Sequence, residues 1–378
     1  MPVDVADPAI QPGLVQQHLE RIAAALTQHG ADGVIVFRKT NILAFTGVPL
    51  EPSDRLVCAF INTDGRIAFV VPAFEADQAG RLPPGSEIVT WQEHDDPYVA
   101  ARIAAERIGL SKATILVDGH TWLDARDRLQ ACMAGAKLVR DPGVLDGIRI
   151  IKSDEEISAI RAACDDTGKI YSLVRQHLRP GITERELSRE VIDQLMRMGV
   201  TPHGDLIQGG PSASVPHQPT GHRRFVNGDA VIVDFVARRL GYHGDMTRTF
   251  SVGAISDEIV SAYSVVREAQ AAAIAAIKPG VTCEEVDRVA RDVIEGEGLG
   301  DYFTHRLGHG IGLDVHEPPY LVQGNRQKLE AGMCVTVEPG VYVPDRFGIR
   351  IEDVIAVTES GCEVLSASVP TDLSDSFR

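Results

Sequence analysis

The most constraining feature of this sequence is an internal duplication in its second half. Arg-Pro-Gly-Ile-Thr followed by Glu-Leu begins at Arg179, and Lys-Pro-Gly-Val-Thr followed by Glu-Val begins 99 positions later, at Lys278. In each copy a helix meets a Pro-Gly turn, after which Thr183 or Thr282 is placed to cap a second helix. The chain therefore has to form two related helix-turn-helix halves.

Each copy then leads into a β-branched run that ends in an acid. Asp234 ends the run in the first copy and Glu338 ends it in the second, and a further acid follows 11 or 14 residues later, at Asp245 and Glu352. The alternation of residue types is typical of strands. We expect a pseudo-twofold α+β domain that closes around one polar site with four carboxylates.

Four carboxylates in one buried cleft predict a bound cation. Without one they would repel each other and become protonated. A nitrogen ligand is available at His309, between Gly308 and Gly310, where the missing side chains would let an ion or substrate approach the backbone. One histidine with four carboxylates suits two hard or borderline divalent ions that share bridging carboxylates.

The first part of the chain has a different pattern, in which short β-branched strands alternate with helices. Helical spacing runs from Leu14 to Leu26 and over 98–108, and strands are predicted at 33–37, 56–61, 67–71 and 114–117. We expect an α/β domain over residues 1–145 and the duplicated domain over 146–378. The polar residues of the first domain lack metal-like or triad-like spacing, so its expected role is structural.

Charge and composition exclude several partners. The chain has 37 Lys and Arg against 53 Asp and Glu, a net charge of −16, which would repel nucleic acid and anionic membranes. No apolar run approaches the ~18 residues that span a bilayer, and the first residues are acidic where a signal peptide is basic. These features predict a cytoplasmic protein that binds neither nucleic acid nor membrane.

The motifs around the acids resemble the pita-bread metallopeptidase family. This family includes prolidase (Xaa-Pro dipeptidase), aminopeptidase P and methionine aminopeptidase, with creatinase as a metal-free relative. The resemblance is carried by residues 231–234, 241–249, 308–312, 337–340 and 350–353. It implies a creatinase-like N-terminal domain with a mixed sheet, followed by a pita-bread catalytic domain.

The resemblance also implies a role for each candidate site residue. Asp234 would chelate one ion, His309 and Glu338 the other, and Asp245 and Glu352 would bridge the two. A metal-bridging hydroxide would attack the scissile carbonyl, Glu338 would relay its proton to the leaving nitrogen, and Arg350 would orient the bridging acids. Manganese is the first expectation for the two divalent ions, with cobalt or zinc as alternatives. The complete ligand set favours an enzyme over a metal-free relative or a non-catalytic binding module.

Two more histidines fit the same scheme. His217 and His316 also lie 99 positions apart, and the resemblance implies that they flank the substrate and polarise its carbonyl or steady the oxyanion. The pattern assigns no role to His222, His243 or His305. It leaves two alternatives for Thr247, a hydrogen bond to a ligand carboxylate or simple packing.

The large N-terminal domain points to the prolidase, aminopeptidase P and creatinase branch, and the segments around His316 and Glu338 look most like bacterial Xaa-Pro dipeptidases. The expected function is therefore hydrolysis of small Xaa-Pro dipeptides by a homodimer.

The sequence departs from the family pattern at two places. The family often has a glycine two residues after the first aspartate; this position is Val236 here, and its side chain would crowd the back of the metal pocket. The arginine that holds a dipeptide's carboxylate in some prolidases has no clear match, with Tyr320 at one candidate position and Arg326 nearby. Aminopeptidase P activity on longer peptides, or a hydrolase or lyase of a non-peptide small molecule, are the alternatives.

Overall fold

The structure is a computed structural model that describes residues 10, 12–50, 54–76, 83 and 85–371 of the 378-residue chain. The chain divides into two compact units, one formed by residues 6–149 and the other centred on residues 150–378. Within the described part, no helix is long and apolar enough to cross a membrane.

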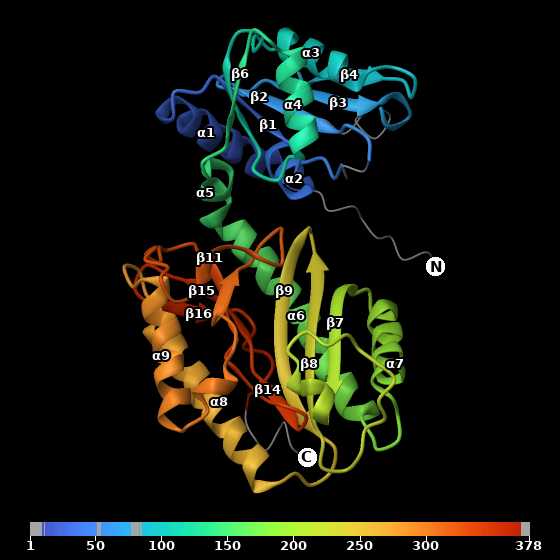
Figure 1. Cartoon of the computed structure of the whole chain (residues 1–378), viewed down its shortest axis with the longest axis vertical. Helices are drawn as coiled ribbons and strands as arrows, with labels where there is room; N and C mark the ends of the chain where they lie inside the picture. The colour runs from blue at the N-terminus through green and yellow to red at the C-terminus, as the bar shows by residue number, and fades with distance from the viewer. Residues whose placement is uncertain (1–9, 11, 51–53, 77–82, 84, 372–378) are drawn as a thin grey trace. The chain divides into compact units, whose positions relative to one another are not determined.

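The N-terminal unit is built on a six-stranded mixed sheet with the strand order β4-β3-β2-β1-β5-β6 (Figure 1). The pairs β1-β2 and β2-β3 are antiparallel, and the other neighbours are parallel. The strands are β1 (Gly33–Val36), β2 (Cys58–Asn62), β3 (Ile67–Pro72), β4 (Glu87–Trp91), β5 (Thr114–Val117) and β6 (Lys137–Arg140). The predicted α/β fold with a mixed sheet is confirmed.

Helices α1 (Pro12–Gln28), α2 (Lys39–Thr46), α3 (Pro97–Arg107) and α4 (Leu123–Cys132) lie beside the sheet of this unit. Helix α5 (Val144–Ile150) follows β6 in the chain. Helix α3 begins where the Asp96 side chain accepts a hydrogen bond from the backbone N–H of Tyr98, with Pro97 at the first helical position. Because strand side chains alternate, Ala68 of β3 packs in the core with α3 and α4 while Ile67 faces a cavity beside α1.

The C-terminal unit contains two antiparallel sheets and a hairpin. The first sheet has the order β7-β8-β9, the second β11-β10-β12-β15-β16, and β13 pairs with β14. The strands of the first sheet are β7 (Thr201–Gly209), β8 (Ala230–Arg239) and β9 (Tyr242–Ser251). The others are β10 (Gly308–Gly310), β11 (Glu317–Leu321), β12 (Cys334–Val337), β13 (Gly340–Val343), β14 (Phe347–Arg350), β15 (Asp353–Val357) and β16 (Cys362–Val364).

Two helix pairs show the predicted duplication. Helices α6 (Asp154–His177) and α7 (Glu184–Arg197) pack on the first sheet, and α8 (Asp257–Ala276) and α9 (Cys283–Gly296) pack against strands of the second half (Figure 1). Thr183 caps α7 through Glu186, and Thr282 caps α9 through Glu285, each as a complete capping box. The two related halves expected from the sequence are present, and the α+β pita-bread fold is confirmed.

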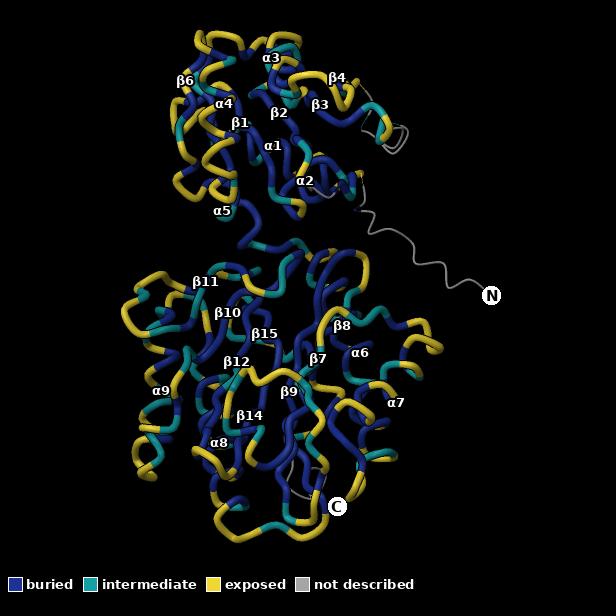
Figure 2. Tube along the Cα trace, turned by 45° about the vertical axis from the view of Figure 1, so that its right-hand side comes forward, coloured by how far each residue is buried: buried dark blue, intermediate teal, exposed yellow. Residues whose placement is uncertain are grey.

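The strand that carries Asp234 is longer than the β-branched run indicates. It does not end at the acid but continues to Arg239, because β8 and β9 pair without a break from Ala230 opposite Ser251 to Arg239 opposite Tyr242. These central strands are buried along most of their length, as the dark trace in Figure 2 shows. Asp234 and Asp245 therefore lie on strands that are buried along most of their length.

Candidate metal centre

All eight candidate site residues line one cavity of about 470 Å³ in the C-terminal unit. The full lining consists of Pro216, His217, Asp234, Asp245, His305, Arg306, His309, His316, Glu338, Tyr342, Arg350 and Glu352. Segments separated by more than 100 residues in sequence thus meet at one place.

The β8–β9 hairpin places the first two acids. Val236 lies directly opposite Asp245 across the hairpin, and Asp234 stands two residues from Val236 on the same face of β8. The carboxylates of Asp234 and Asp245 therefore point into the same space. Val236 is not among the residues that line the cavity, so it does not narrow the space in front of the acids.

Glu352 is fixed by a threonine and an arginine. An isolated bridge joins Thr247 of β9 to Glu352, and the Thr247 hydroxyl donates to Glu352 Oε2 at 2.7 Å. Arg350 Nε donates to the same hydroxyl at 3.2 Å, and Arg350 Nη2 donates to Asp234 Oδ2 at 2.5 Å. Of the two alternatives for Thr247, the structure shows the hydrogen bond to a carboxylate. Arg350 contacts one acid directly and a second through this threonine.

His309 and Glu338 come from neighbouring strands of the second sheet. His309 lies in β10 and Glu338 follows β12 directly. His309 Nδ1 is 3.0 Å from the carbonyl oxygen of Gly310, which can only accept, so Nδ1 carries the proton. The lone pair of Nε2 then points to the acids, 3.3 Å from Glu338 Oε1. This is the tautomer that a metal-binding histidine needs.

The positions on either side of His309 require glycine for a different reason from the one that the sequence suggested. A Cβ atom on Gly308 would lie 2.0 Å from the backbone oxygen of Thr336, and one on Gly310 would lie 2.2 Å from that of Pro318. Both glycines thus allow close approach of neighbouring backbone, not of an ion or substrate. The expectation about these positions was wrong because the sheet, which the local sequence does not reveal, occupies the space.

The buried acids favour their neutral forms when no cation is present. Burial, reinforced by the charges of Asp234 and Glu338, raises the pKa of Asp245 well above its ordinary value. Burial and the charge of Asp245 do the same for the pKa of Glu352, and burial raises the pKa of Glu338 to about 8. Burial also lowers the pKa of His309 to about 3. Each shift has the sign expected where a positive ion would restore the charged carboxylates and use the neutral imidazole.

Three overlapping groups of ligand atoms have the spacing to hold an ion. Among the described residues these groups are Asp234 with Asp245 and Glu352, His309 with Glu338 and Glu352, and Asp245 with His309 and His316. Within each group the ligand atoms lie within 4.8 Å of one another. Glu352 and Asp245 each belong to two groups.

Two carboxylate oxygens in these groups are left without a partner. Asp245 Oδ1 and Glu352 Oε1 are buried and accept no hydrogen bond from any residue that the structure describes. A buried oxygen without a donor costs free energy. The cluster is therefore incomplete as a purely protein structure.

His217 and His316 lie at the exposed rim of the cavity. The imidazole of His316 packs edge-on against that of His309, with ring centroids 4.2 Å apart. Burial, then the positive charge of Arg306, lowers the pKa of His316. No residue that the structure describes forms a hydrogen bond with either rim histidine, so their ring nitrogens are available to a ligand in the cavity.

The structure adds cavity residues to which the sequence pattern gave no role. The Tyr342 hydroxyl lies 2.9 Å from His305 Nε2 and accepts from Arg350 Nη1 at 2.9 Å. His305 Nδ1 donates to the backbone oxygen of Arg306 at 2.7 Å, so Tyr342 donates to Nε2. Tyr342 supports the arginine that holds Asp234. The only signal in the sequence was its place four residues after Glu338.

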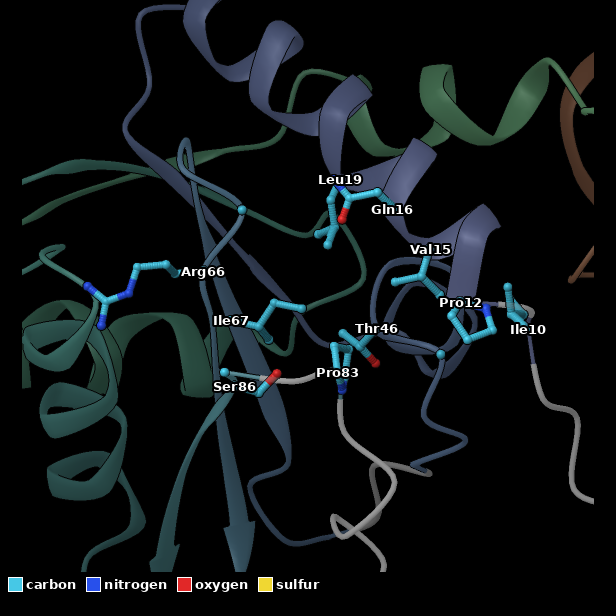
Figure 3. Close-up of a pocket in the computed structure, with 13 residues that line it drawn as sticks. Ile10, Pro12, Val15, Gln16, Leu19, Thr46, Arg66, Ile67, Pro83 and Ser86 are labelled. Atoms are coloured by element: carbon cyan, nitrogen blue, oxygen red, sulfur yellow. The ribbon is translucent and has the colours of Figure 1, made fainter.

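A second cavity, of about 540 Å³, lies in the N-terminal unit (Figure 3). Leu19 and Gln16 of α1, Thr46 of α2 and Ile67 of β3 surround it. Among its described lining residues Arg66 is the one charged side chain, and none is a cysteine, histidine or carboxylate. This cavity offers neither a metal-binding nor a nucleophilic set.

A mixed-sheet α/β unit, a duplicated α+β unit and a buried cluster of four acids and a histidine together define the class of pita-bread metallopeptidases. Residues 158–359 match metallopeptidase family M24, and residues 18–151 match the creatinase/prolidase N-terminal domain. The chain belongs to metallopeptidase family M24, and the resemblance seen in the sequence is confirmed.

Individual relatives support this assignment. The chain is 36% identical over 350 residues to the probable dipeptidase PepE of Mycobacterium tuberculosis, covering 91% of this chain and 92% of that protein. The solved structure of dipeptidase PepE from Mycobacterium ulcerans superposes with a TM-score of 0.87 at 32% identity, covering 94% of this chain and 96% of that chain. The Xaa-Pro dipeptidase from Bacillus anthracis gives a TM-score of 0.86 at 30% identity, covering 95% and 99%.

Proposed function

We propose that this protein is a dinuclear metal-dependent dipeptidase that hydrolyses the Xaa-Pro bond of dipeptides. The observation that carries the proposal is the pair of buried oxygens, Asp245 Oδ1 and Glu352 Oε1, which accept no hydrogen bond from any described residue. They lie in a cluster of five candidate metal ligands. The substrate class is supported by the names of the relatives, which are dipeptidases and an Xaa-Pro dipeptidase.

The residues present fit two divalent ions. Asp234 would hold one ion, His309 and Glu338 would hold the other, and the carboxylates of Asp245 and Glu352 would be shared. One nitrogen and otherwise oxygen donors suit manganese, with cobalt and zinc as alternatives. When bound, the ions would acidify a water molecule and polarise the scissile carbonyl.

The chain's own residues supply the proton transfer and the positioning. Glu338, which faces the cavity beside His309 Nε2, would take the proton of the attacking water and deliver it to the leaving nitrogen. The ring N–H groups of His316 and His217 at the rim would donate hydrogen bonds to the carbonyl oxygen as it becomes negatively charged. Arg350 would keep Asp234 in place through its 2.5 Å hydrogen bond.

A proline bond suits this arrangement for a chemical reason. The nitrogen of the Xaa-Pro amide is part of the proline ring and carries no hydrogen, so a site that held its substrate through an N–H donor at this nitrogen would fail. In the proposed mechanism, the groups that face the cavity would act on the carbonyl oxygen and on the leaving nitrogen. The nitrogen must gain a proton to leave as a secondary amine, and Glu338, which lines the cavity, would supply it.

The test is a panel of Ala-Pro, Leu-Pro, Ala-Pro-Ala and Ala-Ala, incubated with chelator-stripped protein to which manganese, cobalt or zinc is restored singly. Metal-dependent cleavage of the Xaa-Pro dipeptides alone would support the proposal. Cleavage of Ala-Pro-Ala at the Ala-Pro bond would make the protein an aminopeptidase P instead. If two ions bind per chain and no peptide is cut, the substrate class is wrong and the site assignment stands. Light scattering would test the homodimer that the family resemblance leads us to propose.

A further inference from the structure

The imidazole of His217 reaches the rim of the cavity from a loop, and nothing within the protein holds the ring itself. Of the residues that the structure describes, none forms a hydrogen bond with this ring. Its position therefore depends on the backbone of residues 209–221, which we call the His217 loop. A catalytic group that is misplaced by about 1 Å can lose roughly 100-fold in rate, so the support of this backbone matters for the reaction.

The matching histidine of the second half is supported in a different way. Seven positions before His316 stands His309, and the two rings pack edge-on with centroids 4.2 Å apart. Seven positions before His217 stands Gly210, where a Cβ atom would lie 2.4 Å from Asp229 Oδ1. The first half thus has no ring at the matching position, and its loop needs another support.

That support is a buried glutamine beneath the loop. The side chain of Gln208 in β7 is 0% exposed, and its Nε2 donates to the backbone oxygens of Gln218 at 2.6 Å and Val215 at 3.2 Å. The backbone oxygen of Pro216 lies 3.5 Å from the same nitrogen. Backbone oxygens can only accept, so the nitrogen of the amide faces the loop. Its two N–H groups serve carbonyl groups on both sides of His217.

The sheet register places this glutamine on the face that carries a metal ligand. Gln208 lies opposite Ile232 across β7 and β8, and Leu206 lies opposite Asp234. Because side chains alternate along a strand, the two pairs point to the same face of the sheet. Gln208 does not line the cavity, however. It can act on the site only through the loop.

The base of the His217 loop is closed by a buried acid. The carboxylate of Glu184, which is 1% exposed, accepts the backbone N–H of Gly209 at 3.0 Å and that of Gly221 at 2.9 Å. These two glycines are the first and last residues of the loop. With its ends fixed in this way, the loop depends on Gln208 for the placement of the residues around the histidine.

The glutamine also has a cost for the fold. Its Oε1 is buried and accepts no hydrogen bond from any described residue. A buried acceptor without a donor lowers stability, and an apolar side chain of similar size would avoid this cost. The feature that only the amide supplies is its pair of N–H groups, which point to the loop.

We propose that Gln208 is a positioning residue that holds the backbone around His217 and so fixes the imidazole at the rim of the cavity. The inference rests on the proposed function, which takes this ring as a donor to the substrate carbonyl. Arg350, which bonds Asp234, also donates through Nη1 to the backbone oxygen of Pro216 at 3.4 Å. The Pro216 carbonyl thus joins the loop that Gln208 holds to the arginine of the metal site.

Loss of the amide donors should displace the loop and leave the metal ligands in place. Gln208→Met keeps the length of the side chain and removes both N–H groups. Its kcat for Ala-Pro should fall by roughly 10- to 100-fold, the scale of a displaced or lost donor, with metal content and KM little changed. The loss should not exceed that caused by His217→Gln, because Gln208 acts through this histidine.

The first measurement is an NMR spectrum, which does not depend on turnover. Protein loaded with diamagnetic zinc is labelled with 13C at Cε1 of its 12 histidines, and each signal is assigned by its loss in a histidine-to-glutamine variant. Gln208→Met should shift or broaden the His217 signal. Gln194→Met is the matched control, because its amide nitrogen lies 2.7 Å from His177 Nε2. It should change the His177 signal and leave the His217 signal and kcat unchanged.

The second measurement is a double-mutant cycle on kcat with Ala-Pro. Gln208→Met should lower kcat in wild type and cause almost no further loss in His217→Gln. A merely structural role would lower kcat by the same factor in both backgrounds. Circular dichroism and metal analysis check that the four proteins are folded and loaded. Gln208→Asn, whose amide is one methylene shorter, should show the same changes to a smaller extent and replaces Gln208→Met if that variant does not fold.

The outcomes separate this inference from the proposed function. If the His217 signal is unchanged in the Gln208 variants, the inference is refuted, whether or not Ala-Pro is hydrolysed. If the signal changes but kcat does not fall, or falls equally in both backgrounds, Gln208 does not act through His217 and the inference is again refuted. If wild type hydrolyses no Xaa-Pro peptide, the proposed function fails, and a changed His217 signal still supports the positioning role.

Discussion

Replacing Glu338 by glutamine should stabilise the metal-free protein and destabilise the metal-loaded protein. In the absence of a cation, Glu338 is a buried carboxyl whose pKa is raised to about 8 from an ordinary value of 4.5, with burial as the main cause. A neutral amide of similar shape removes the need to keep this group protonated. With ions present, the same change removes a proposed ligand.

The size of the effect follows from the proton that the folded chain retains. A carboxyl whose pKa is raised by folding contributes stability that is fully present below pH 4.5 and is lost as the pH rises through about 8. Between pH 4.5 and pH 7 the unfolded chain loses the Glu338 proton while the folded chain keeps it. Over these about 2.5 pH units the free energy of unfolding falls by about 3 kcal/mol, at 1.36 kcal/mol per unit. This is an upper value, because Asp245 and Glu352 titrate in the same cluster. Glu338→Gln should recover up to that amount at pH 7 and almost none at pH 4.5.

The assay is urea unfolding of wild type and Glu338→Gln, at both pH values, with chelator or with excess manganese. The chain has two tryptophans, Trp91 and Trp122, and both lie in the N-terminal unit. Tryptophan fluorescence therefore follows that unit, and its transition serves as an internal control. Circular dichroism follows the whole chain, so the transition that it shows in addition belongs to the catalytic unit.

Two results would refute this reasoning. The metal-free Glu338→Gln variant could be no more stable than metal-free wild type at pH 7, or it could gain as much stability over wild type at pH 4.5 as at pH 7. In either case burial does not raise the pKa of the Glu338 carboxyl, and the argument for a cation is wrong. If manganese stabilises both proteins equally, Glu338 is not a ligand. The expected result is a reversal of the order of stability when manganese is added.

Three further predictions concern the site and the helix caps. His309→Ala should lower kcat/KM by more than about 100-fold, the scale found when residues that only orient metal ligands are changed, and metal analysis should show lost ion. His217→Gln and His316→Gln should each lower kcat by roughly 100-fold or more, as loss of one oxyanion donor does, with metal content unchanged; a loss of metal on changing His316 would instead make it a ligand. Thr183→Ala and Thr282→Ala should each lower the free energy of unfolding by about 1 kcal/mol, measured by circular dichroism in urea, since each removes one capping bond.

Much of the architecture was predictable because its determinants are local. The threonine and glutamate of each capping box lie three residues apart, so the starts of α7 and α9 are encoded within one turn of helix. The alternating strands and helices of the N-terminal unit likewise depend on short periodic patterns. The acids at duplicated positions indicated one shared site, and Asp234, Asp245, Glu338 and Glu352 do line one cavity.

The sequence by itself therefore determined the duplicated fold, the family and the residue types of the site. Only the tertiary structure decided that Arg306 and not Arg326 faces the cavity, that Tyr342 supports Arg350, and that Gly308 and Gly310 make room for backbone. The physical reason is that these facts depend on strand register and on contacts between segments far apart in the chain. Arg306 and Arg326 are indistinguishable as residue types in the sequence, but in the structure Arg306 stacks on Tyr320 beside β10 and lines the cavity.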